Sequence, residues 1–201
     1  MLFRSDWVFT SGYTLSYPYS RDALTDWIEG LPENIPFVFD PTPVISDIPR
    51  PTLSRVLART TWLSCNVTEA ADIAGPGDVE TLAARLFADH CPQAAGVVIR
   101  SAAKGCHIRL ADGTAQTIAG FKVAAIDTNG AGDTHIGAFV SALARGAPPF
   151  EAARYANAAA AISVTRHGGS SAPTDAEIQT FLSQLAATGT PGQTQKAHQT
   201  A

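Results

Sequence analysis

Four short apolar runs, separated by helical segments, constrain the fold of this chain more than any other feature. They lie at residues 7–9, 36–40, 61–65 and 96–100. Between them, apolar periodicity and turn residues predict helices over 21–29 with Ser20 as N-cap, from Pro51 onward, and over 78–90 with Asp78 as N-cap. This alternation predicts an α/β fold, with a mostly parallel sheet, right-handed crossovers and helices on both faces.

The pattern changes after residue 100. Residues 106–110 and 114–119 flank Asp112-Gly113, which indicates a β-hairpin. Further helices are expected to about residue 145, over 150–164, and over 175–185 with Thr174 as cap. Residues 188–201 are rich in Gly, Pro, Thr and Gln, which predicts a flexible tail after a single domain over residues 1–187.

Composition excludes several classes of protein. Hydrophobic residues make up 45% and charged residues 16%, as in globular proteins, and the net charge of −4 gives no basic surface for nucleic acid. No apolar run approaches the roughly 18 residues of a membrane span. The three cysteines lack Cys-x-x-Cys spacing, the five histidines form no metal-ligand pattern, and the N-terminus lacks the layout of a signal peptide. We therefore expect a cytoplasmic protein with reduced thiols and no nucleic-acid or membrane partner.

The segment 125–140 carries the clearest chemical signal. A loop with Gly130 and Gly132 opens a helix, and the free N–H groups and dipole at a helix N-terminus attract anions. Asp133 stands among these donors. One interpretation makes it a first-turn acid that suits the helix dipole; the other makes it a general base that deprotonates a substrate hydroxyl during phosphoryl transfer.

The string Asp127-Thr128-Asn129-Gly130-Ala131-Gly132-Asp133 resembles the C-terminal signature of the PfkB (ribokinase-like) carbohydrate kinases. That resemblance implies a ribokinase-like, Rossmann-like fold and ATP-dependent phosphorylation of a sugar-like hydroxyl. ATP, Mg²⁺ and a sugar-like small molecule would be the ligands. By the same resemblance Asp133 is the base, and Gly130, Ala131 and Gly132 form the anion hole.

Asn66 and Glu69 follow the third apolar run and have two compatible interpretations. Asn at an N-cap with Glu three residues later is close to a capping box. The pair also resembles the Asn-x-x-Glu motif of the same family, in which Glu69 would help place magnesium through water and Asn66 would lie near the nucleotide.

The segment 97–105 resembles the family's nucleotide loop, usually Thr-x-Gly-x-x-Gly, and departs from it. Arg100 stands at the Thr position, Ala102 at the first Gly, and Gly105 survives. We expect Arg100, Lys104 and Gly105 beside the nucleotide, where Arg100 either neutralises a phosphate or is a solvated charge. Residues 40–43 resemble a stretch that commonly carries Asn where this chain has Thr42, although a proline turn explains them as well.

The resemblance extends to residues 154–169. It places Asn157 in the adenine pocket, while the alanines around it predict close helix packing. It also implies a loop for a monovalent cation such as K⁺, formed by Asp127 and by backbone carbonyls near Asn129, Ser163, Arg166 and Gly168.

The resemblance matches only the later part of a family member, because the glycine-rich sugar motif and the β lid are missing from this chain. Three accounts stand open: a mis-started frame, one piece of a split enzyme, or a degenerate relative. Excised strands would leave a sheet edge unpaired, so we expect a homodimer or a missing N-terminal part, and weak kinase activity. A non-catalytic remnant that binds nucleotide or a partner is the alternative. A P-loop is absent, and the glycine spacing argues against a dinucleotide site.

Overall fold

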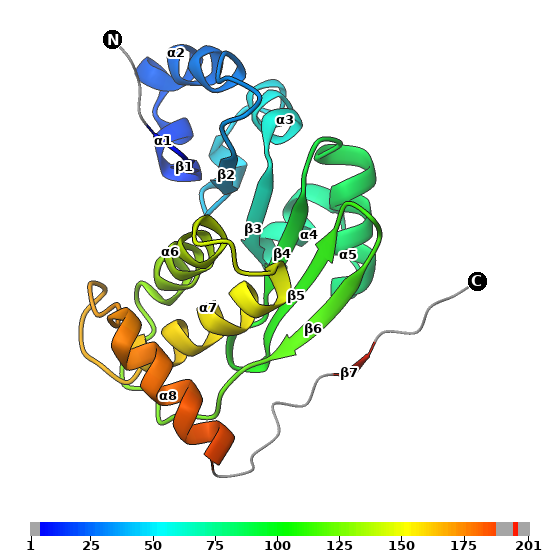
Figure 1. The fold of residues 1–201 in the computed structure, drawn as a ribbon. Coiled ribbons are helices and arrows are strands. Elements are labelled where there is room, and N and C mark those ends of the chain that lie inside the picture. The colour runs from blue at the N-terminus through cyan, green and yellow to red at the C-terminus, as the bar shows by residue number, and fades with distance from the viewer. Residues whose placement is uncertain (1–4, 188–194, 197–201) are drawn as a thin grey trace. The chain divides into compact units, whose positions relative to one another are not determined.

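The computed structural model describes residues 5–187 and 195–196. The chain divides into two compact units, one of Met1–Arg100 with Arg109–Ala115, the other of Ser101–Ile108 with Gln116–Ala201. Figure 1 shows the elements of both. Each unit is described by itself below. Most of the predicted tail lies outside the described residues.

The first unit is built on four parallel strands. They are β1 (Val8–Ser11), β2 (Phe37–Asp40), β3 (Trp62–Asn66) and β4 (Gly96–Arg100), adjacent in that order. In register, Ser11 lies opposite Asp40, and Asn66 lies opposite Arg100. Every residue of β2 is buried, as expected for a strand covered on both faces. The four apolar runs are thus confirmed as a parallel sheet.

Helices connect these strands. They are α1 (Gly12–Ser16), α2 (Pro18–Glu29), the 3₁₀ turn η1 (Ile45–Asp47), α3 (Arg50–Arg59), α4 (Val67–Ala74), α5 (Val79–Arg85) and the π turn η2 (Leu86–His90). Asp78 caps α5 as predicted, since its side chain accepts a hydrogen bond from the N–H of Thr81. The prediction of Ser20 as a cap was wrong. Helix α2 begins at Pro18, whose fixed φ and missing N–H suit a first turn.

The core of the first unit lies between this sheet and its helices. Its fully buried side chains include Phe37 and Phe39 of β2, Leu63 of β3 and Ile99 of β4. Burial of such side chains contributes roughly 2–3 kcal/mol each. The carboxyl ends of β2, β3 and β4 are therefore held by a packed core.

The hairpin is confirmed. Strand β5 (Gly105–Leu110) is followed by β6 (Ala115–Ala119), and Gly113 at the turn has φ +84°. The 3₁₀ turn η3 (Ala102–Lys104) precedes β5, and the two-residue strand β7 (Gln195–Lys196) pairs antiparallel with β6.

The second unit contains three helices, α6 (Ala131–Ala144), α7 (Pro149–Ser163) and α8 (Asp175–Ala187). The predicted alanine packing is confirmed, because α7 buries six of its seven alanines and α6 buries Ile136 and Phe139. Small side chains let two helices approach closely. The buried alanines of α7 are Ala152, Ala153, Ala156, Ala158, Ala159 and Ala161.

Candidate functional site: a helix N-terminus and a buried arginine cluster

The loop before α6 turns into the helix through Gly130. This residue is the N-cap, in the left-handed region at φ +73°, and no side chain caps the helix. A Cβ at Gly130 would lie 2.2 Å from the carbonyl oxygen of Gly169. Glycine is therefore required by both conformation and space. The result is an uncapped helix N-terminus whose first turn contains Ala131, Gly132 and Asp133.

Asp133 lies in that first turn and is exposed. Its position fits both interpretations of the sequence, the acid that suits the helix dipole and the base that faces a ligand. The predicted grouping of Gly130, Ala131, Gly132 and Asp133 at one helix terminus is found. Their catalytic roles stay predictions.

Asp127 organises the loop. Its Oδ1 accepts a hydrogen bond of 2.9 Å from the N–H of Asn129, and its Oδ2 accepts one of 3.0 Å from the N–H of Gly168. These backbone donors hold the pKa of Asp127 below its usual range. Three residues of the expected cation loop are thus joined by one carboxylate.

Ser163, a further candidate for the monovalent cation, is already engaged. Its carbonyl oxygen accepts hydrogen bonds of 3.1 Å from the N–H of Arg166 and from Ser171 Oγ. A carbonyl with both lone pairs occupied is a poor cation ligand. The arrangement of Ser163 does not fit K⁺, and the K⁺ site as a whole stays a prediction.

Asn157 is buried, and its side-chain amide is fully used within the second unit. Its Nδ2 donates to the carbonyl oxygens of Ile118 (3.0 Å) and Ala119 (3.2 Å), and its Oδ1 lies 3.1 Å from His135 Nε2. Asn157 therefore ties α7 to β6 and α6. A role beside adenine stays a prediction.

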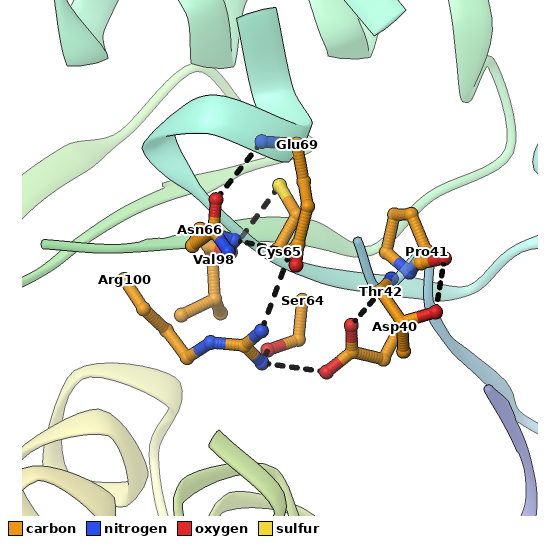
Figure 2. Close-up of polar contacts among 9 residues, drawn as sticks. All are labelled: Asp40, Pro41, Thr42, Ser64, Cys65, Asn66, Glu69, Val98 and Arg100. Atoms are coloured by element: carbon orange, nitrogen blue, oxygen red, sulfur yellow. Dashed lines mark hydrogen bonds and ion pairs between the residues drawn. The ribbon is translucent and has the colours of Figure 1, made fainter. Parts of the chain in front are cut away.

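The first unit holds a buried ionic cluster at the carboxyl ends of its strands (Figure 2). Arg100 Nη1 lies 2.9 Å from Asp40 Oδ2 and 2.8 Å from Ser64 Oγ, and Arg100 Nη2 lies 3.5 Å from Glu69 Oε2. The Arg100 side chain is only 13% exposed. Burial alone would lower the pKa of Arg100, but the charge and hydrogen bond of Asp40 outweigh it and raise the pKa.

This cluster corrects the interpretation of Arg100 as a solvated charge, because the side chain is buried and paired with two carboxylates. Asp40 and Ser64, which form half of the cluster, were not identified as its partners from the sequence. Because ligands of such sheets bind beyond the carboxyl ends of the strands, the sequence predicts that Asp40, residues 65–69, residues 100–105 and residues 127–133 lie near one another. The structure brings Asp40, Glu69 and Arg100 together. The proximity of residues 127–133 stays a prediction.

The capping box at the start of α4 is confirmed. The N–H of Glu69 donates to Asn66 Oδ1 (2.9 Å), and the N–H of Asn66 donates to Glu69 Oε2 (2.7 Å). Burial raises the pKa of the Glu69 carboxyl, while the N–H of Asn66 works against that shift. Glu69 Oε2 thus serves the cap and the ion pair with Arg100 at once. The roles of Asn66 and Glu69 toward nucleotide and magnesium stay predictions.

The predicted nucleotide loop contains one strained residue. Ala102 has φ +50°, a left-handed conformation that costs a non-glycine residue about 1–2 kcal/mol. It stands where the family pattern has glycine. Gly105 has φ +98°, and a Cβ there would lie 2.0 Å from the carbonyl oxygen of Ile118, so only glycine fits this position. Lys104 is exposed. Contact of Lys104 and Gly105 with nucleotide stays a prediction.

Thr42 is the second left-handed residue that is not glycine, at φ +59°. Its N–H donates 3.1 Å to Asp40 Oδ1, which closes a turn after β2. The family stretch that residues 40–43 resemble commonly has Asn here, and Asn tolerates this conformation better than Thr. The proline turn expected from the sequence is present, and it orients Asp40 toward Arg100.

Residues 5–187 and 195–196 contain no group of three or more His, Cys, Asp or Glu side chains able to hold a metal ion. None of their helices has the length and apolarity required to cross a bilayer. The three cysteines are buried and form no disulfide.

The sequence of residues 5–176 matches the family described as pfkB family carbohydrate kinase. The chain belongs to the PfkB family. This PfkB-family chain is 33% identical over 176 residues to the uncharacterized sugar kinase YegV of Escherichia coli (strain K12), a match that covers 85% of the chain and 53% of the relative. It thus spans about half the length of that relative.

Solved structures give the same fold for the PfkB-family chain. The ribokinase of Thermotoga maritima superposes with a TM-score of 0.74 at 29% identity, covering 89% of this chain and 57% of that one. A putative ribokinase II from E. coli, in complex with ATP and Mg²⁺, superposes with a TM-score of 0.78 at 22% identity, covering 89% and 59%. The ribokinase-like α/β fold predicted from the sequence is confirmed.

Proposed function

We propose that this chain belongs to an ATP-dependent kinase that phosphorylates a sugar-like hydroxyl. It forms the half of the active site that binds the nucleotide and carries the general base. The observation that carries the proposal is the start of α6. Gly130 turns the chain into an uncapped helix N-terminus, and Asp133 stands exposed in its first turn. Membership of the carbohydrate kinase family and a structural relative that binds ATP and Mg²⁺ support ATP as the phosphoryl donor.

In this mechanism the backbone of the helix start and Asp133 divide the work. The N–H groups from Gly130 to Asp133 stabilise negative charge that develops on the transferring phosphoryl group. Asp133 accepts the proton of the attacking hydroxyl, so that its oxygen becomes a better nucleophile. The bond from this oxygen to the γ-phosphorus forms as the bond from that phosphorus to the bridging oxygen breaks, and ADP leaves with the electron pair. Magnesium would accompany ATP on its phosphates.

The test is Asp133→Asn, assayed by ADP release with a panel of sugars. The assay uses the chain alone and the chain fused to the portion of the E. coli relative that it does not match. We expect a loss of about 100-fold or more in turnover, because a general base contributes roughly that much. Glu151→Gln is the matched control, since Glu151 is an exposed first-turn acid of α7. Unchanged turnover in Asp133→Asn would refute the assignment of Asp133 as the general base.

A second function is favoured by the buried cluster. Arg100 is already paired with the carboxylate of Glu69, which suits a remnant that binds nucleotide or a partner without catalysis. Calorimetric titration with ATP separates the two functions. ATP binding without ADP release in either form of the protein would support the remnant, and sugar-dependent ADP release would exclude it.

A further inference from the structure

The carboxylates of Asp40 and Glu69 are buried and converge on one guanidinium (Figure 2). Asp40 is 6% exposed and Glu69 4% exposed at the side chain. Carboxylate oxygens are the ligands that Mg²⁺ prefers. Two carboxylates at the carboxyl ends of neighbouring strands therefore provide suitable ligands for a divalent cation.

Both oxygens of the Asp40 carboxylate and one oxygen of the Glu69 carboxylate already have partners within the chain. Asp40 accepts the N–H of Thr42 on Oδ1 and Arg100 Nη1 on Oδ2. Glu69 Oε2 accepts the N–H of Asn66 and faces Arg100 Nη2. The guanidinium is also fixed by its 2.8 Å hydrogen bond to Ser64 Oγ.

Arg100 cannot yield its place by losing its proton, because a guanidinium stays charged at any physiological pH. A divalent ion on the same oxygens would lie beside this charge in a buried setting, where repulsion is weakly screened. Mg²⁺ also retains several waters, which need space that the arginine side chain fills.

We propose that Arg100 is a built-in counter-cation, which occupies the place of a divalent ion between Asp40 and Glu69. This chain then binds no divalent ion at Glu69, contrary to what the Asn-x-x-Glu motif suggests. Removal of the guanidinium opens a site for one. The inference refines the proposed kinase function by leaving magnesium to the nucleotide, and it holds whether or not phosphoryl transfer occurs.

The test measures Mn²⁺ binding without nucleotide, by the electron paramagnetic resonance signal of free Mn²⁺ and by the melting temperature at increasing MnCl₂. The variants are Arg100→Thr, Arg100→Lys, Glu69→Gln, and Arg100→Thr combined with Glu69→Gln. The matched control is Arg55→Thr. Arg55 also bridges two carboxylates, of Asp26 and Glu29, but these three side chains are 41–69% exposed.

We expect no Mn²⁺ binding in the wild type or in Arg100→Lys. Arg100→Thr should melt at a lower temperature without metal and recover as Mn²⁺ rises, whereas the melting temperature of the wild type should stay unchanged over the same Mn²⁺ range. The double variant and Arg55→Thr should show no recovery. That pattern would mean that a metal ion and a guanidinium are interchangeable here.

Two results would overturn the inference. One is stoichiometric Mn²⁺ binding by the wild type that is lost in Glu69→Gln. The other is a folded Arg100→Thr, judged by circular dichroism, that gains no Mn²⁺ affinity. If Arg100→Thr does not fold, the comparison of wild type with Glu69→Gln still decides, because the wild type must not bind. Failure of the kinase proposal would appear in ADP release and leave these measurements unchanged.

Discussion

Replacement of Gly130 by alanine tests whether the loop before α6 is built as described. The backbone of Gly130 is left-handed, at φ +73°, where alanine costs about 1–2 kcal/mol. The new Cβ would lie 2.2 Å from the carbonyl oxygen of Gly169, a backbone atom that can move only with its loop. Overpacking of this kind costs about 1–3 kcal/mol.

Alanine also lowers the conformational entropy of the unfolded chain relative to glycine, which offsets about 0.4–1 kcal/mol of this cost. We therefore expect Gly130→Ala to lower the free energy of unfolding by about 2–4 kcal/mol. For a protein of this size, each kcal/mol shifts the melting temperature by about 2–4 °C, so the expected loss is roughly 5–15 °C. The measurement is thermal and urea unfolding followed by circular dichroism.

Gly137→Ala is the matched control in the same helix. A Cβ at Gly137 meets nothing within 4 Å, so this substitution should raise stability by up to about 1 kcal/mol through helix propensity. If Gly130→Ala proved as stable as the wild type, the close approach to Gly169 and the left-handed turn would both be wrong. Equal losses in the two variants would point to a general effect of glycine in α6.

Four further outcomes are expected. Ala102→Gly should raise stability in urea by up to about 1 kcal/mol, because it relieves a left-handed alanine at φ +50°; a loss would contradict the strain. Phe9→Lys should reduce self-association in sedimentation velocity, since Phe9 is 47% exposed on the outermost strand β1; an unchanged mass would exclude this edge as the contact. The pKa of Asp127 is lowered in the folded protein, so its contribution to stability is present above about pH 4 and is lost as pH falls through the lowered pKa. Asp127→Asn should therefore reduce the pH dependence of the free energy of unfolding in that range. Burial raises the pKa of Cys91 to about 12, so this thiol should resist alkylation at pH 8 until the chain is unfolded.

Elements with strong local signals were predictable from the sequence. Buried strands such as β2 follow from continuous apolar runs, and the hairpin follows from Asp112-Gly113, because these signals reside in a few neighbouring residues. The N-cap Asp78 was found for the same reason. Ser20 failed because Pro18, two residues earlier, is itself a favourable first helical residue.

The partners of Arg100 could not be predicted in the same way. Asp40 lies 60 residues earlier in the chain, and only the register of β2, β3 and β4 brings the two side chains together. The sequence showed that Arg100 departs from the family motif. Such a departure does not indicate which buried group pairs with the arginine. The left-handed conformation of Ala102 was hidden likewise, since alanine gives no signal for it.

The division of the chain into two units has a consequence for how the protein can be dissected. The backbone passes from one unit to the other between residues 100 and 101, again between 108 and 109, and a third time between 115 and 116. A single cut therefore releases neither unit whole. A fragment that ends at Arg100 lacks Arg109–Ala115, and a fragment that starts at Ser101 carries that stretch without its unit. A fragment made by a single cut is therefore expected to be less stable than the whole chain.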